Sequence, residues 1–314
     1  MRVLVTGASG WVGSAVVPQL LESGHQVVGL ARSDASAEAL TAAGAEVLRG
    51  DLDDLDGLRA AAAASGGVIH LAFKHDIAFS GDFLGAVEAD RLAIETVGDA
   101  LAGSSRPFLI ASGTLGMTPG RVATESDGQA VPPGSLAEPD GEAPNPRLLN
   151  AQRVVALASE GVRSVVVRLP PTVHGDGDDN GFMATIVGIA RQKGVSGYVG
   201  DGSNRWPAAH RLDAAQVFRL GLEHAPAGST LHAVAEEGIS LREIAEVIGR
   251  HLDLPLTSID PGDAAAHFGW LGGFIGVDSP ASSTRTRDLL GWQPTHPGLL
   301  EDLEAGHYFR TSGS

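Results

Sequence analysis

The sequence MRVLVTGASGWVG, residues 1–13, decides the fold of this protein. Residues 2–6 are mainly apolar and β-branched, which predicts a short buried strand. Apolar side chains then recur every four residues, which predicts a helix over 11–23. Three glycines separate the two elements, so a strand should run through a glycine turn directly into a helix.

Each glycine of this turn has a separate use. Gly7 permits the tight turn, Gly10 permits close approach of the backbone to a ligand, and Gly13 permits close packing of helix on strand. The free N–H groups at the start of such a helix bind phosphate. We therefore predict that this segment holds the pyrophosphate of NAD(P).

Short apolar strands and helical stretches continue to alternate beyond the turn. The pattern predicts strands over 26–31, 46–49, 68–71, 108–112 and 164–169 and helices over 35–43, 53–64 and 241–252. Such alternation is typical of an α/β fold with a doubly wound parallel sheet, the Rossmann arrangement. We expect a dinucleotide-binding domain over 1–168 and about 210–235, and a smaller substrate lobe over 169–209 and 236–314. The Gly- and Pro-rich segment 118–146 is expected to be a surface loop.

Composition narrows the possible partners and location. The 314 residues carry a net charge of −16, which disfavours nucleic acid as a partner. No cysteine is present, so thiolate catalysis and disulfides are excluded, and no convincing metal-ligand spacing occurs. We find no apolar run of 18 residues and no start typical of a signal peptide, so we expect no membrane span and a cytoplasmic location.

The end of the second predicted strand bears on cofactor choice. NAD-binding sites usually place an acidic residue there for the ribose hydroxyls, but this strand ends in Ala31 and Arg32. Arg32 could pair with a 2′-phosphate, or it could be a solvated surface residue. We expect NADP as the cofactor, with NAD possible.

Several segments, in this order and spacing, resemble the extended or atypical short-chain dehydrogenases/reductases (SDR). The matching segments are Thr6–Gly13, Asp51-Leu52, His70-Leu71-Ala72, Arg168–Gly175 with His174 where the family usually has tyrosine, Gly200–Gly202, His210–Ala215 and Leu290–Pro294. The resemblance covers nearly the whole chain and implies a nicotinamide dinucleotide cofactor. The expected cofactor residues are Gly7, Ser9, Gly10, Trp11, Val12, Gly13, Arg32, Asp51, Leu52, Leu71, Ala72 and Arg147.

The Tyr-x-x-x-Lys pair of that family is missing. The chain has two tyrosines, Tyr198 and Tyr308, and neither is followed by lysine four residues later. Counting back from the strand at 164–169 puts the lysine position near Arg147 and the tyrosine position near Ala143, and a shift of one turn puts Arg147 at the tyrosine position. Arginine cannot donate a proton near neutral pH, so another group must act or no proton donor is needed.

Other polar and aromatic residues are candidates for the chemistry. The expected catalytic residues are Ser112, Thr114, His174 and Lys74, and the expected substrate residues are His75, Met117, Phe182, Trp206 and Trp270. A structural alternative stands beside each assignment: the hydroxyls could cap a turn, the histidines could be structural, and the aromatic rings could be core residues.

Three functions fit these observations. We expect an NAD(P)-dependent oxidoreductase that acts on a small aromatic or quinoid substrate, because an acidic phenol relies less on an enzyme base than a simple alcohol does. An SDR-fold monooxygenase that hydroxylates an aromatic polyketide hydroquinone is one alternative. A non-catalytic NADP-binding sensor or regulator is the other, and a homodimer is possible in each case.

Overall fold

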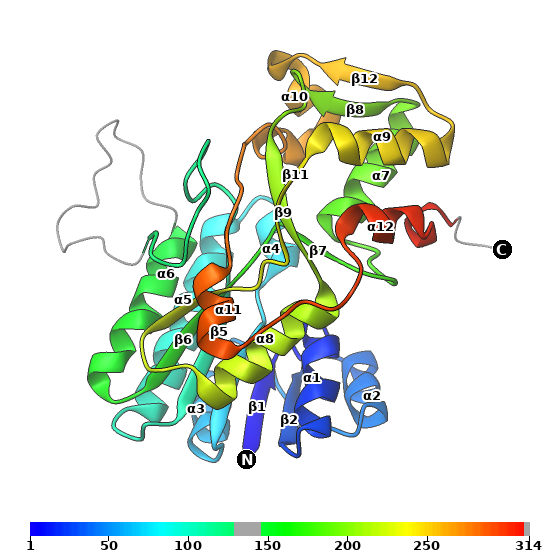
Figure 1. Ribbon diagram of the computed structural model, residues 1–314. Helices are drawn as coiled ribbons and strands as arrows, with labels where there is room; N and C mark the ends of the chain where they lie inside the picture. Colours follow the sequence, from blue (N-terminus) through cyan, green and yellow to red (C-terminus); the bar gives the residue numbers. More distant parts are fainter. Residues whose placement is uncertain (129–145, 311–314) are drawn as a thin grey trace.

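The computed structural model describes residues 1–128 and 146–310 and is built on a parallel sheet of seven strands (Figure 1). Their order is β10-β6-β5-β4-β1-β2-β3, with every pairing parallel. The strands are β1 (Arg2–Thr6), β2 (Gln26–Ala31), β3 (Glu46–Arg49), β4 (Gly67–His70), β5 (Pro107–Gly113), β6 (Arg163–Leu169) and β10 (Ser229–His232). The predicted doubly wound sheet is confirmed.

The strands have continuous apolar runs because both faces of the sheet are covered. In β1, Val3 and Val5 pack into the hydrophobic core on one face, while Leu4 packs into the core on the other. In β6, Val165 packs into the first of these cores and Val166 packs into the second. Successive side chains of a strand point to opposite faces, so an unbroken apolar run is what a doubly covered strand requires.

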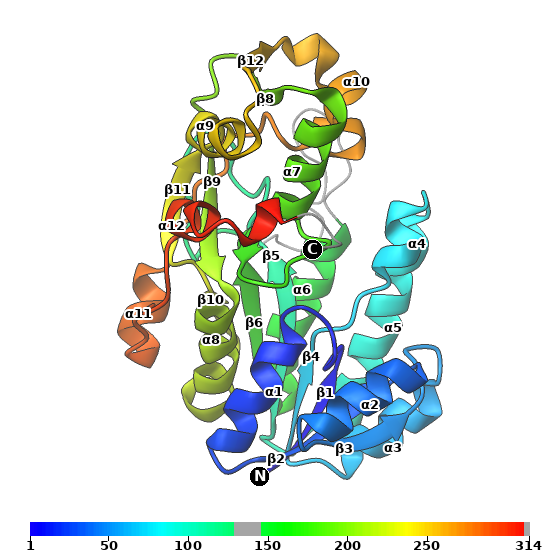
Figure 2. The same ribbon diagram turned by 90° about the vertical axis from the view of Figure 1, so that its right-hand side faces the viewer.

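Helices on the two faces complete these cores (Figures 1 and 2). One face is covered by α1 (Gly13–Glu22), α2 (Asp34–Ala42) and α8 (Arg211–His224), and the other by α3 (Leu55–Ala63), α5 (Phe83–Leu101) and α6 (Pro146–Ala156). The short helix α4 (His75–Phe79) follows β4 and precedes α5. None of the helices in the described ranges combines the length and the apolar character needed to cross a bilayer.

The rest of the chain forms a second group of elements beyond the carboxyl ends of the main strands (Figure 1). It contains a three-stranded and a two-stranded sheet with their own apolar core. The strands are β7 (Thr172–His174), β9 (Arg205–His210) and β11 (Glu236–Ser240), then β8 (Ser196–Val199) and β12 (Leu256–Ile259); the helices are α7 (Phe182–Lys193), α9 (Leu241–Leu252), α10 (Ala264–Phe268) and α12 (Leu299–Glu304).

One helix of the C-terminal part returns to the main sheet. Helix α11 (Thr284–Leu290) packs beside α8 and β10, although it lies inside the range 236–314 expected for the substrate lobe. The division into a dinucleotide-binding domain and a substrate lobe stays a prediction. In the segment 118–146, Ala123 bridges to Ala281 and α6 begins at Pro146, while 129–145, including the predicted tyrosine position Ala143, lies outside the described residues.

A buried polar pair holds two elements of the second group together. The Nδ1 atom of His174, on β7, lies 2.8 Å from a carboxylate oxygen of Asp302, on α12. The His174 side chain is completely buried, and Asp302 is 7% exposed. Because buried polar atoms need partners, this contact fixes α12 against β7.

Asp302→Ala is expected to destabilise the fold. It leaves the buried His174 ring without its partner, which should lower the free energy of unfolding by about 1–3 kcal/mol. Glu304→Gln is the matched control, because Glu304 lies on the same helix but pairs on the surface with Arg250 and His251. Denaturant unfolding followed by circular dichroism measures both variants. Equal midpoints for the Asp302 and Glu304 variants would contradict a structural role for the buried pair.

Candidate dinucleotide and substrate cleft

The glycine turn is packed so tightly that side chains would collide with backbone. Gly7 has a φ of +65°, and a Cβ there would lie 2.7 Å from the amide nitrogen of Ala72. A Cβ on Gly13 would lie 2.1 Å from the carbonyl oxygen of Gly7. The Gly10 amide donates to that same oxygen at 3.0 Å. The turn therefore brings bare backbone to the start of α1, which fits the pyrophosphate of a dinucleotide.

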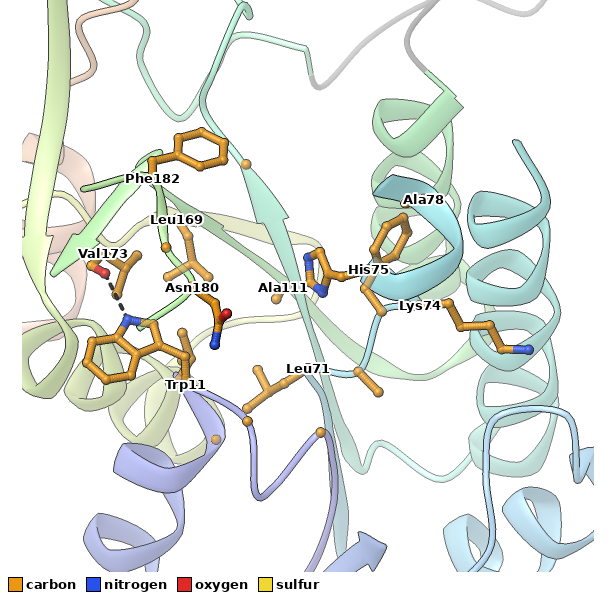
Figure 3. Close-up of a pocket in the computed structure, with 18 of the residues that line it drawn as sticks. Trp11, Leu71, Lys74, His75, Ala78, Ala111, Leu169, Val173, Asn180 and Phe182 are labelled. Atoms are coloured by element: carbon orange, nitrogen blue, oxygen red, sulfur yellow. Dashed lines mark hydrogen bonds between the residues drawn. The ribbon is translucent and has the colours of Figure 1, made fainter. Parts of the chain in front are cut away.

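A cleft of 1940 Å³ opens from this turn along the carboxyl ends of the central strands (Figure 3). Parallel sheets of this kind bind ligands at that edge. All twelve residues predicted to bind the cofactor line the cleft, from Gly7 to Arg147. The cleft also extends to aromatic residues of the C-terminal elements, so one continuous space could hold a dinucleotide and a substrate.

Trp11 connects the turn to the substrate side. Its indole N–H donates to the carbonyl oxygen of Val173 at 2.8 Å (Figure 3). The guanidinium of Arg211 lies 4.5 Å from the centre of the Trp11 ring, a cation–π contact. Sequence reasoning did not assign Arg211 to the site, although it quoted 210–215 as a matching segment.

Charged pairs surround the end of the cleft near β2 and α3. Arg32 contacts Asp76 at 3.0 Å, and the hydrogen bond from Arg32 lowers the pKa of this carboxyl. Lys74 contacts both carboxylate oxygens of Asp53 at 2.6 Å, and its side chain points away from that of His75 (Figure 3). Asp51 accepts hydrogen bonds from the backbone of the segment leading into α3. Lys74 is thus engaged by a surface carboxylate.

The opposite end of the cleft is largely apolar and aromatic. Ser112, at the end of β5, lines it together with Met117. The Phe182 ring stands edge-on to that of Trp270, with 5.5 Å between centroids. Among the lining residues of the whole cleft that sequence reasoning missed are Phe73, Phe83 and Asn180. Phe73 directly follows the matching segment His70-Leu71-Ala72, which was the one available signal for it.

Three predicted site residues do not line the cleft. Thr114 is fully buried, and its amide donates to the carbonyl oxygen of Leu169 at 3.0 Å. Trp206 is fully buried and donates to the carbonyl oxygen of Val277. His174 is engaged by Asp302, as described above. These placements support the structural alternatives for all three residues.

Helix α6 presents arginine where the resemblance implies a catalytic pair. Arg147 lies in the first turn of α6, and its guanidinium is 4.2 Å from the centre of the Phe73 ring. Ala151, one turn further along, is buried. Neither tyrosine is among the described residues that line the cleft. Burial raises the pKa of Tyr308, whose hydroxyl donates to Asp178 at 3.0 Å.

A buried chain of polar groups lies beneath Arg147. Thr6 of β1 is 2.8 Å from the Nδ1 atom of His70, and the Nε2 atom of His70 is 3.2 Å from Asp90 on α5. Asn150 of α6 donates to Asp90 at 2.8 Å. Burial opposes ionisation of Asp90, but the hydrogen bonds from His70 and Asn150 and the charge of Arg147 lower its pKa. A carboxylate is thus held beneath the cleft.

Comparison with known proteins defines the class of protein. Residues 3–234 match the NAD dependent epimerase/dehydratase family, so the chain belongs to that family. This confirms the resemblance to extended SDR proteins. A dTDP-glucose 4,6-dehydratase from Streptomyces venezuelae, solved with NAD and TYD bound, has a similar fold, with a TM-score of 0.74, 18% identity and coverage of 98% of this chain and 96% of that chain.

The chain also has relatives over its whole length. The uncharacterized protein C2A9.02 of Schizosaccharomyces pombe is 46% identical over 310 residues, or 98% of this chain and 100% of that protein. YLL056C of Saccharomyces cerevisiae is 45% identical over 98% of this chain and 99% of its own. More distantly, a 4-hydroxy-2-methyl-3-oxo-4-farnesyl-3,4-dihydroquinoline-1-oxide ketoreductase of Stigmatella aurantiaca is 25% identical over 86% of this chain and 80% of its own.

Gly10→Val is expected to abolish dinucleotide binding. The valine side chain would occupy the space at the turn where the pyrophosphate must approach the backbone. Gly188→Ala is the control, because Gly188 lies on α7 in open space away from the cleft. Calorimetric titration with NADPH and NADH measures the affinity, and circular dichroism verifies folding. A folded Gly10→Val protein with wild-type affinity would show that the turn does not hold the pyrophosphate.

Proposed function

We propose that this protein is an NAD(P)-dependent oxidoreductase that acts on a small aromatic or quinoid substrate without a tyrosine proton donor. The observation that carries the proposal is the continuous cleft that is lined by the glycine turn, by Ser112 and by aromatic residues, with no tyrosine among its described lining residues. Membership in the NAD dependent epimerase/dehydratase family supports the nicotinamide cofactor.

The aromatic end of the cleft favours a flat substrate. Trp270 and Phe274 are each 45% exposed and line the cleft, and Phe182 packs against Trp270. Such rings can stack on a planar ligand. The Stigmatella aurantiaca relative, named as a ketoreductase of a dihydroquinoline oxide, agrees with a substrate of this kind.

Ser112 can hold the oxygen of the substrate. It stands at the carboxyl end of β5, next to the pocket wall formed by Ala111 and Gly113. A fixed donor to an oxygen that gains negative charge can contribute about 10²–10³ in rate. A quinone or phenol also stabilises that charge by itself, because the ring delocalises it. The chemistry therefore requires less from an enzyme acid than reduction of a simple ketone would.

An assay with both aerobic and anaerobic arms distinguishes the three candidate functions. The purified protein is mixed with NADPH or NADH and with planar quinones, aryl ketones, an aliphatic ketone or a sugar nucleotide. Substrate-dependent loss of reduced nicotinamide under argon supports the oxidoreductase. Oxygen uptake with a hydroquinone and no nicotinamide consumption supports a monooxygenase, and tight binding without turnover supports a sensor. Turnover of sugar nucleotides alone would overturn the aromatic substrate.

Arg32→Ala is expected to weaken NADP binding more than NAD binding. A charge-assisted contact with the 2′-phosphate contributes about 1.5–3 kcal/mol, or roughly tenfold or more in affinity. Arg49→Ala is the control, because Arg49 lies on the next strand and pairs with Asp34 outside the cleft. Calorimetric titration of each variant with NADP and NAD gives the ratio. An equal loss for both dinucleotides, or none for either, would contradict preference for NADP through Arg32.

Trp270→Ala is expected to raise the KM for planar substrates by about tenfold while changing the affinity for NADP little. The reason is the loss of one aromatic stacking partner, worth about 1–2 kcal/mol with its buried area. Leu289→Ala is the control, because Leu289 is a large apolar residue of similar exposure on α11, outside the cleft. Steady-state kinetics with a quinone measures both. A KM unchanged by the tryptophan replacement would place the substrate elsewhere.

A further inference from the structure

We propose that His75 exchanges a proton with the substrate oxygen, in place of the missing tyrosine; this inference rests on the proposed function. His75 is the first residue of α4, directly after the loop that follows β4. Figure 3 shows its ring reaching into the cleft near Leu71 and Ala111, the lining residues from the ends of β4 and β5. Leu71 belongs to the predicted cofactor residues, so the imidazole lies beside the expected path of the dinucleotide.

The other ionisable groups of the cleft are less suited to this role. Lys74 is held by Asp53, and Asp76 is held by Arg32. Asp178 accepts hydrogen bonds from the amide of Gly181 and the hydroxyl of Tyr308. Among the described residues that line the cleft, His75 supplies the one imidazole, the side chain whose ordinary pKa lies closest to neutrality.

Contacts of the His75 ring connect it to the residue that replaces the family's catalytic pair. The His75 ring lies edge-on to Phe73, with 5.1 Å between centroids, and Arg147 stacks on the same Phe73 ring. Desolvation within the cleft and the positive charge of Arg147 lower the pKa of His75, while the neighbouring Asp76 opposes them. The groups that act on the ring are therefore a cation from α6 and a carboxylate from α4 that is itself paired with Arg32.

The lowered pKa sets the preferred direction of proton transfer. Near neutral pH the imidazole is mainly uncharged, so it is ready to accept a proton from an alcohol as the alcohol carbon gives its hydride to the oxidised nicotinamide. In the reverse direction, the carbonyl carbon gains a hydride from reduced nicotinamide, the carbonyl oxygen gains the proton of the His75 imidazolium, and solvent protonates the ring again. Reduction should therefore slow as the pH rises above the pKa of His75, and oxidation should slow below it.

His75→Asn tests the inference in the whole protein, with His224→Gln as the control because His224 is an exposed histidine at the end of α8. We expect at least a hundredfold loss of kcat with an aryl ketone or quinone, loss of the pH dependence, and unchanged calorimetric affinity for the dinucleotide. Wild-type activity and pH profile in a folded His75→Asn protein would overturn the inference.

A second measurement does not depend on turnover. Histidine labelled with ¹⁵N gives the titration midpoint of His75 by NMR, with NADP bound and with or without 1-naphthol as a probe. We expect a midpoint below 6.5 that falls further when the naphthol hydroxyl donates to the uncharged ring, and that rises in Arg147→Gln because a lowering charge is removed. A midpoint that naphthol does not move would overturn the inference. Absence of turnover with every aromatic substrate would instead overturn the proposed function, and the naphthol shift would still decide whether His75 faces the ligand oxygen.

Discussion

No side chain fits between the glycine turn and the backbone that surrounds it. At Gly13 a Cβ would lie 2.1 Å from the carbonyl oxygen of Gly7, and at Gly7 it would meet the backbone of Ala72. This close contact sets the distance of α1 from the sheet and of the β4 loop from the turn. The positions of Trp11 and of the residues that follow Ala72 depend on this contact. Two walls of the cleft are therefore positioned by the same backbone contact.

The central sheet could be predicted from the sequence because its strands obey a simple physical rule. A strand covered on both faces needs an unbroken apolar run, and 26–31 matches β2 in both bounds. The C-terminal elements were harder to predict, because their short strands carry mixed residues and pair between distant segments, such as β7 with β9. Helix α11 returns to the main sheet by tertiary packing that no local pattern indicates.

All the predicted cofactor residues line the cleft, whereas two of the four predicted catalytic residues, Thr114 and His174, do not, for a related reason. Backbone-binding positions follow from glycine spacing, whereas a side chain acts only if it points into the cleft. On β7, Val173 lines the cleft, so the next residue, His174, points to the opposite side and meets Asp302. A one-residue alternation of this kind is invisible when the position of the cleft is unknown. Lys74 and His75 are likewise neighbours in the sequence, and their side chains point in different directions (Figure 3).

The loss of the tyrosine is accompanied by a consistent arrangement of charge around Arg147. A guanidinium in a partly closed cleft costs solvation unless an anion or an aromatic face compensates it. Phe73 provides the face, and Asp90 provides the charge, since Arg147 contributes to the lowered pKa of that carboxyl. Asp90 is in turn held by His70, which Thr6 fixes next to the glycine turn. The segment that leads into the glycine turn thus also orders the charge beside His75, so we expect changes to the turn and changes to α6 to alter the surroundings of the same imidazole.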